Sequence, residues 1–214
     1  MTIITQKRIW SGTSSTSTDC DLIPFAVFGG GGSNIPVNDE LTGCILGSDL
    51  KKGKAMGKEQ KTNAMRILDR AKVAYEVNTY ECDEFIDGCH IADQLGQKYD
   101  ESFKTLVTKG KSGGYFVFAL PVDKELDLKA AAASVGEKSV SMIHVKEINQ
   151  ITGYIRGGCT PVGMKKKFPT VIDSSCLSFE KIIISGGRIG VQIIISPADL
   201  LKVTDGKTAD ITAK

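Results

Sequence analysis

The stretch Ser102-Phe103-Lys104-Thr105-Leu106-Val107 is the element around which the fold is organised. Its composition predicts a short strand that carries a lysine and a threonine next to each other. A second element, Ser185-Gly186-Gly187-Arg188-Ile189-Gly190, predicts a glycine-rich turn between two strands of almost unbroken isoleucine. A lysine on a buried strand is costly unless an anionic or hydrogen-bonding group meets it. We therefore expect a binding site at Lys104.

Composition restricts the class of protein. The chain has 214 residues, enough for one sizeable domain with an appendage or for two small domains. Apolar residues make up 41%, which suffices for a core, and no apolar run is long enough to span a bilayer. Residues 1–10 lack the apolar segment of a secretory signal, so we expect a cytoplasmic protein. The net charge of +2 is nearly balanced, so contact with nucleic acid requires a local basic patch.

The six cysteines are scattered, without a Cys-x-x-Cys pair. A chain without a secretory signal normally keeps its cysteines reduced. Cys82, Cys89 and His90 are close enough in sequence to suggest a metal site, but a structural zinc site needs a second pair of ligands at similar spacing. We therefore interpret these cysteines as buried or half-buried thiols and expect no metal.

The composition of the chain changes near residue 56. Residues 11–18 are almost entirely Ser, Thr and Gly, and Gly29–Gly32 is a run of glycines. Such tracts behave as flexible linkers. We expect residues 1–55 to be a leader or fusion segment without a readable function, and residues 56–214 to form the folded domain. A small natural two-stranded extension is the alternative for the first segment.

The second part of the chain shows helical and strand patterns in irregular alternation. Helical spacing of apolar residues predicts helices over 60–73, 89–95, 126–135 and 145–151, and Ser196 and Pro197 predict the start of another. Apolar runs predict strands over 75–80, 103–108, 115–122, 140–143, 170–173, 181–185 and 191–195, with a glycine-bearing hairpin loop at 109–114. The fold class is therefore α/β or α+β with a mixed β-sheet.

Known catalytic motifs are missing from the sequence. It has no Gly-x-Ser-x-Gly elbow, no His-Glu-x-x-His motif, no P-loop and no dinucleotide-binding fingerprint. Its two histidines, His90 and His144, are not in a recognisable triad, which argues against most hydrolases that activate a nucleophile with histidine. The remaining candidates are a lysine, hydroxyl groups and glycine loops, at Lys104, Thr105, Tyr80, Ser185, 157–163 and 186–190.

Two interpretations compete at these candidates. Glycine loops can present several N–H groups to an anion or to a developing oxyanion. The same glycines can instead only close tight turns between strands, which is the more common case. Lys104 can bind an anion, or it can protect the edge of a sheet against aggregation. The residues alone leave both questions open.

A series of short motifs also occurs in one order along the second part of the chain. The motifs are Val77-Asn78-Thr79-Tyr80-Glu81, Phe103-Lys104-Thr105-Leu106, Phe118-Ala119-Leu120-Pro121-Val122, Glu125-Leu126-Asp127-Leu128-Lys129, Thr152-Gly153-Tyr154-Ile155-Arg156-Gly157-Gly158, Thr160-Pro161-Val162-Gly163, Lys165-Lys166-Lys167-Phe168-Pro169-Thr170-Val171-Ile172-Asp173 and Ser185-Gly186-Gly187-Arg188-Ile189-Gly190. With them, residues 61–211 resemble the YbaK/EbsC family, the free-standing relatives of the editing domain of bacterial prolyl-tRNA synthetase. Residues 1–55 are not covered.

The resemblance implies a mixed β-sheet or barrel-like core surrounded by helices. It also implies hydrolysis of mischarged aminoacyl-tRNA, Cys-tRNA(Pro) in the YbaK branch, in trans beside prolyl-tRNA synthetase and without a cofactor. Carried over by position, the expected catalytic residues are Lys104, Thr105, Gly158 and Ser185. The expected substrate-binding residues are Tyr80, Gly157, Gly186, Gly187 and Gln192. Gln192 departs from the family, which has an aspartate there, so a role that needs a charge at this position is not supported.

The missing histidine base is consistent with this chemistry, because an aminoacyl ester is already activated and needs mainly positioning and stabilisation of the oxyanion. The resemblance implies that the thiol of the cysteinyl group attacks its own ester carbonyl. Lys104 would then hold the terminal phosphate or ribose of the tRNA, and the Gly157 and Gly158 amides would fix the aminoacyl group. Cys159 lies in the same loop, but nothing nearby in sequence lowers its pKa, so we interpret it as pocket lining.

The basic run Lys165-Lys166-Lys167 is a candidate contact for tRNA phosphates, with a solvated loop as an equal alternative. Two other functions stay open. One is deacylation of Ala-tRNA(Pro) by an enzyme of the same fold, and the other is binding of RNA or a nucleotide without turnover.

Overall fold

The computed structural model describes residues 61–82 and 86–213. In these two ranges the chain forms five α-helices, two short 3₁₀ helices and eight strands. The helices are α1 (Asn63–Arg70), α2 (Gly88–Leu95), η1 (Tyr99–Glu101), α3 (Leu128–Val135), α4 (Val145–Thr152), η2 (Ser174–Ser178) and α5 (Pro197–Thr204). The strands are β1 (Glu76–Thr79), β2 (Phe103–Gly110), β3 (Tyr115–Pro121), β4 (Val140–Met142), β5 (Thr170–Asp173), β6 (Ile182–Ser185), β7 (Val191–Ile195) and β8 (Lys207–Ala209).

The ends of the helices follow local sequence signals. Helices α2, α3 and α4 end at Gly96, Gly136 and Gly153, each in the left-handed conformation that costs glycine least. Ser196 is the N-cap of helix α5, and its side chain accepts a hydrogen bond from the backbone N–H of Asp199 in the first turn. Pro197 follows at the first helical position. The predicted last residues of α2 and α3 and the predicted start of α5 are confirmed, and α4 ends one residue later than predicted.

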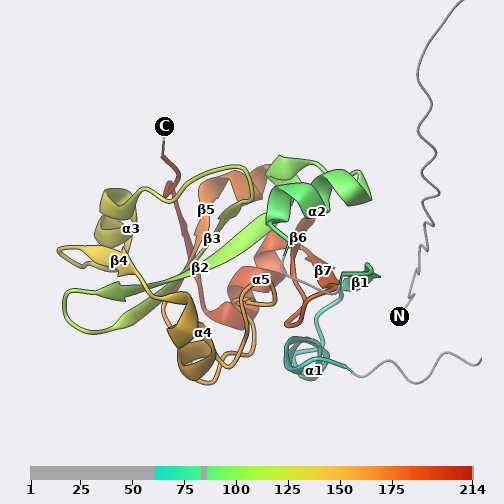
Figure 1. The fold of residues 1–214 in the computed structure, drawn as a ribbon, viewed down its shortest axis with the longest axis horizontal. Helices are drawn as coiled ribbons and strands as arrows, with labels where there is room; N and C mark the ends of the chain where they lie inside the picture. The colour runs from blue at the N-terminus through green and yellow to red at the C-terminus, as the bar shows by residue number, and fades with distance from the viewer. Residues whose placement is uncertain (1–60, 83–85, 214) are drawn as a thin grey trace, which may run out of the picture. The chain divides into compact units, whose positions relative to one another are not determined.

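The strands form two sheets (Figure 1). One is antiparallel, in the order β1-β7-β6, and the other is mixed, in the order β4-β2-β3-β5-β8. In the mixed sheet β5 runs parallel to β3, and β8 runs parallel to β5. A parallel bridge between Ser102 and Ile183 joins the start of β2 to β6. The predicted α+β class with a mixed sheet is confirmed, and β2 lies where the two sheets meet.

The central strands β3 and β5 of the five-stranded sheet are buried on both faces. On β3, Ala119 belongs to the core shared with α1, α5 and the three-stranded sheet, whereas Phe118 and Leu120 belong to a second core with α3. On β5, Ile172 and Val171 divide in the same way. Strands buried on both faces have nearly continuous apolar sequences, which explains the composition of β3 and β5.

The expected leader, residues 1–55, lies outside the described residues, so the domain boundary at residue 56 stays a prediction. Within the described residues, none of the helices has the length and apolar character needed to cross a membrane.

Candidate active site

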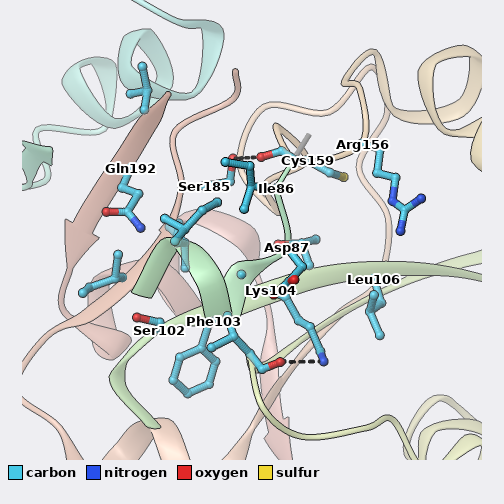
Figure 2. Close-up of a pocket in the computed structure, with 18 of the residues that line it drawn as sticks. Ile86, Asp87, Ser102, Phe103, Lys104, Leu106, Arg156, Cys159, Ser185 and Gln192 are labelled. Carbon is cyan, nitrogen blue, oxygen red and sulfur yellow. Dashed lines mark hydrogen bonds between the residues drawn. The ribbon is translucent and has the colours of Figure 1, made fainter. Parts of the chain in front are cut away.

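A pocket of about 320 Å³ lies where the two sheets meet (Figure 2). Its walls come from the start of β2, from β6 and β7, from the start of α2 and from the loop after α4. These segments are far apart in the sequence and come together only in the fold. Six predicted site residues line the pocket: Tyr80, Lys104, Thr105, Gly157, Ser185 and Gln192.

Lys104 projects from β2 into this pocket (Figure 2). Its neighbour β4 pairs with β2 only at residues 108–110, so one edge of β2 is not covered by β4 at Lys104. The half-buried side chain donates from Nζ to the Val122 carbonyl oxygen at 2.9 Å. A lysine ammonium has three N–H donors, so this bond fixes its position and leaves donors for a ligand. These donors allow Lys104 to bind an anion, and the edge left uncovered by β4 is also compatible with edge protection.

Ser185 and Gly157 connect two walls of the pocket. Ser185, the last residue of β6, donates from Oγ to the Gly157 carbonyl oxygen at 3.4 Å (Figure 2). Tyr80 also lines the pocket, and its backbone N–H donates to the Gly190 carbonyl oxygen at 3.0 Å. Burial raises the pKa of the Tyr80 hydroxyl, although a hydrogen bond with the Gly190 backbone lowers it. The hydroxyl is therefore protonated at neutral pH and can donate a hydrogen bond.

The side chain of Gln192 is held in an amide network. Gln192 pairs with Asn78 in the register of β7 and β1, and its Oε1 accepts from Asn78 Nδ2 at 3.3 Å. The same oxygen accepts from Gln97 Nε2 at 2.8 Å, and Gln192 Nε2 donates to Gln97 Oε1 at 3.1 Å. Gln192 is 9% exposed, so these bonds satisfy most of a buried amide. A neutral side chain thus occupies the pocket wall without needing a charge.

Gly158 was predicted to lie in the pocket, but the structure places it behind the lining residues. It is buried and does not line the pocket, and its N–H donates to the Ile155 carbonyl oxygen at 3.0 Å. This amide is used within the loop, and its predicted contact with the aminoacyl group stays a prediction. A methyl group at this position would lie 2.9 Å from the Arg188 Cα. Gly158 instead lets the loop after α4 pack against the turn between β6 and β7.

Gly186 and Gly187 also lie outside the pocket lining. The Gly186 N–H donates to the Val191 carbonyl oxygen at 2.8 Å, and Gly187 has a φ of 95°. These are features of a tight turn, in which a positive φ favours glycine. The structure therefore gives both glycines a role in closing the turn, and their contact with substrate stays a prediction.

The side chains of Lys165, Lys166 and Lys167 have different surroundings. Lys165 donates from Nζ to the carbonyl oxygens of Asn149 and Gln150 at 3.0 and 3.3 Å, so it caps the end of α4. Lys166 and Lys167 are exposed and line a separate cavity of about 120 Å³, which shares no residue with the first pocket. A contact of these two lysines with tRNA stays a prediction.

Cys159 lines the pocket, as expected from its place in the glycine loop. Burial raises the pKa of its thiol to about 12. A thiol with this pKa is protonated at neutral pH, whereas a nucleophilic cysteine must be a thiolate. The structure supports the interpretation of Cys159 as lining and not as nucleophile.

Sequence reasoning missed Asp87 and Arg156, which both line the pocket (Figure 2). Asp87 caps α2: its Oδ1 accepts from the backbone N–H groups of Cys89 and His90, and its Oδ2 lies 2.5 Å from His90 Nδ1. The bond with the His90 side chain contributes most to lowering the pKa of Asp87. An aspartate directly before a glycine and a helix is a cap signal that could have indicated its position.

The suggested metal site at Cys82, Cys89 and His90 has another explanation. Among residues 61–82 and 86–213, no three His, Cys, Asp or Glu side chains are grouped as metal ligands. Cys89 is a free thiol, and the His90 ring pairs with Asp87.

The arrangement favours positioning and charge stabilisation over nucleophilic catalysis. The described lining residues include two cations, Lys104 and Arg156, one carboxylate, Asp87, and no histidine. Ser185 bonds a carbonyl group and not a base. Such a pocket can hold an anionic or polar ligand against fixed N–H and O–H donors, and it can stabilise an oxyanion.

Comparisons with known proteins agree with this chemistry. The profile of the aminoacyl-tRNA editing domain matches residues 90–203. Over 157 residues the chain is 43% identical to EbsC of Enterococcus faecalis, a protein named as a Cys-tRNA(Pro)/Cys-tRNA(Cys) deacylase, and the match covers 73% of this chain and 96% of EbsC. It is 23% identical over 154 residues to ProXp-y of Escherichia coli K12, named as a multifunctional Ser/Thr-tRNA deacylase, with 70% and 90% of the two chains covered.

A solved structure shows the same fold. The crystal structure of a trans-editing protein for prolyl-tRNA synthetase superposes with a TM-score of 0.63 and 23% identity. The match covers 72% of this chain and 99% of that one.

Proposed function

The chain belongs to the aminoacyl-tRNA editing domain family, and from this premise we propose that it hydrolyses mischarged Cys-tRNA(Pro) in trans. The observation that carries the proposal is the 43% identity to a named cysteinyl-tRNA deacylase over 96% of that protein's length. The partners are the mischarged tRNA and prolyl-tRNA synthetase, the enzyme that misloads it.

The geometry of the pocket suits an aminoacyl ester at the end of a tRNA. Lys104 Nζ is fixed by the Val122 carbonyl and keeps donors for the terminal phosphate or ribose. Arg156 adds a second positive charge on the same pocket. Tyr80, Thr105 and Ser185 contribute hydroxyl groups that orient the aminoacyl group. The contribution of the protein is to hold the ester in a reactive geometry.

The thiol of the substrate supplies the nucleophile that the protein lacks. Its sulfur attacks the ester carbonyl, a C–S bond forms, and the ester C–O bond breaks. The thiol proton passes to the ribose oxygen, and the tRNA leaves with a free hydroxyl group. Water then opens the cyclic thioester and gives cysteine. This route explains why the pocket works without a thiolate at Cys159, whose pKa is raised to about 12.

The test is deacylation of Cys-tRNA(Pro) by the wild type, by Lys104→Ala and by Lys104→Met, which keeps most of the apolar volume. Both variants should lose about 100-fold or more in kcat/KM, because they remove the fixed charge that holds the end of the tRNA. Lys111→Ala is the matched control, since Lys111 is an exposed lysine of the hairpin loop between β2 and β3. Thermal unfolding checks that each variant is folded. Unchanged deacylation by both Lys104 variants would refute the assignment.

A further inference from the structure

The described lining of the pocket contains one carboxylate, that of Asp87 at the start of α2. Its side chain is 52% exposed, so a ligand in the pocket can reach it. In the view of Figure 2 Asp87 lies between Ser185 and Lys104. The other charged side chains of this lining are the cations Lys104 and Arg156. The pocket therefore carries charges of both signs.

The carboxylate of Asp87 keeps one acceptor position for a ligand. Its Oδ1 accepts from the backbone N–H groups of Cys89 and His90 at 2.9 and 3.2 Å, and its Oδ2 lies 2.5 Å from His90 Nδ1. A carboxylate has about four acceptor positions, so these three bonds fix its orientation and leave one position on Oδ2. The His90 side chain is 76% exposed and does not line the pocket, so it leaves the pocket space open to a ligand.

Charge interactions place Asp87 near Lys104. Burial contributes most to raising the pKa of the Cys89 thiol, Asp87 raises this pKa further, and Lys104 lowers it. Both charges therefore lie close enough to Cys89 to act on one sulfur atom. Lys104 Nζ donates to the Val122 carbonyl oxygen and not to Asp87, so the two charged groups are free to bind different parts of one ligand.

An aminoacyl ester carries a group that complements the carboxylate. Its α-amino group is attached to the carbon next to the ester carbonyl, so it enters the pocket together with the ester. This amino group titrates near neutral pH, and a neighbouring carboxylate favours its cationic form. Lys104 and Arg156 repel a cation, so Asp87 is the charged side chain of the described lining that can bind it.

From this arrangement we infer that Asp87 binds the α-amino group of the aminoacyl ester and makes the pocket selective for esters of free amino acids. The inference rests on the proposed function and deepens it, because it adds a specificity-determining residue to the same site. A hydrogen bond between two charged groups is stronger than one between neutral groups. Esters whose amino group is absent, or is part of an amide as in peptidyl-tRNA, lack this charged contact.

The experiment compares kcat/KM for tRNA(Pro) carrying cysteine with that for tRNA(Pro) carrying 3-mercaptopropionate. The second acyl group keeps the thiol and the ester and lacks only the α-amino group. Asp87→Asn removes the charge and keeps a good N-cap for α2. It should lower kcat/KM for the cysteinyl ester about five- to tenfold, and that for the 3-mercaptopropionyl ester less than about twofold, since a half-exposed charge pair contributes less than a buried one.

Asp127→Asn is the matched control. Asp127 is the N-cap of α3, its side chain also accepts from two backbone N–H groups, and it does not line the pocket. This variant should keep both values of kcat/KM within about twofold of the wild type. Thermal unfolding checks that each variant is folded, and Asp87→Ser, which also keeps an N-cap, replaces Asp87→Asn if that variant does not fold.

The ratio of the two values of kcat/KM separates recognition from capping. If Asp87→Asn lost equally on both esters, or lost on neither, Asp87 would not recognise the amino group and the inference would be overturned. The same change of ratio in Asp127→Asn would also overturn it, because the effect would then not come from the pocket.

Binding of non-hydrolysable analogues keeps the inference separate from the proposed function. If the wild type hydrolyses neither ester, the proposed function fails, and calorimetry with adenosine carrying a 3′-cysteinylamido or a 3′-(3-mercaptopropionyl)amido group still tests the contact. The wild type should bind the cysteinyl compound about five- to tenfold more tightly, and Asp87→Asn should lose this preference. Equal affinity of the wild type for the two compounds would contradict a contact between Asp87 and the amino group.

Discussion

Replacing Gly158 by alanine should separate two walls of the pocket without touching a ligand-binding side chain. The added methyl group would lie 2.9 Å from the Arg188 Cα and 3.1 Å from the Arg188 carbonyl carbon. Carbon atoms attract each other at ~3.5 Å, so the loop and the turn between β6 and β7 must move apart by about 0.6 Å. Both contacts are backbone atoms, so rotation of a side chain cannot relieve them. Gly158 needs to be glycine because of this close approach.

The expected loss of stability is about 1–3 kcal/mol, the usual cost of inserting a methyl group into a packed region. For a chain of this length, each kcal/mol lowers the melting temperature by about 2–4 °C. The movement also separates Ser185 from Gly157, so kcat/KM for Cys-tRNA(Pro) should fall about 10- to 100-fold at a temperature where the variant is folded. Differential scanning calorimetry and single-turnover deacylation measure the two effects.

Gly114→Ala is the control for this prediction. Gly114 lies in the loop between β2 and β3, and an added methyl group would come no closer than 3.4 Å to another atom. This variant should keep the stability and the activity of the wild type. If Gly158→Ala behaved in the same way as Gly114→Ala, the close packing of the two pocket walls would not matter for the site.

Three further substitutions test other parts of the account. Cys159→Ser should keep deacylation within about threefold of the wild type, because a protonated thiol is not the nucleophile; a loss of several orders of magnitude would make Cys159 catalytic. Gln97→Leu should lower the free energy of unfolding in urea by about 1–3 kcal/mol, since the buried Gln192 amide loses two hydrogen bonds; an unchanged midpoint would remove the amide network as a stabilising feature. Asp127→Ala should make stability less sensitive to acid: two backbone N–H groups at the start of α3 lower the pKa of Asp127, so its contribution is present above its ordinary pKa and is lost as the pH falls through the lowered value. Urea unfolding at several pH values between neutral and strongly acidic measures this, and parallel curves for the two proteins would contradict it.

The elements of the fold that local chemistry determines could be predicted from the sequence. Glycines end three helices, and the strands over 103–108 and 115–122 appear with only small changes in their bounds. The division of the strands into two sheets and the short strand β8 were not predicted. Pairing between strands depends on residues far apart in the chain, so a local pattern carries little information about it.

In the pocket, too, some residues could be predicted from the sequence and others could not. Lys104, Ser185 and Gln192 line it as predicted, and their roles stay predictions. The glycines were harder to interpret, because a glycine can be required by a close backbone approach, by a positive φ or by a contact with a ligand. Gly158 is required by a close backbone approach, and Gly187 has a positive φ. Only the coordinates of their neighbours separate these cases.

The most direct test of the central claim is the single-turnover rate of the wild type on Cys-tRNA(Pro) and on Ala-tRNA(Pro) at one enzyme concentration. The account predicts release of cysteine far above the spontaneous rate, and faster than release of alanine by about tenfold or more, because the alanyl ester lacks the attacking thiol. Release of alanine at an equal or higher rate, or release of cysteine only at the spontaneous rate, would contradict it.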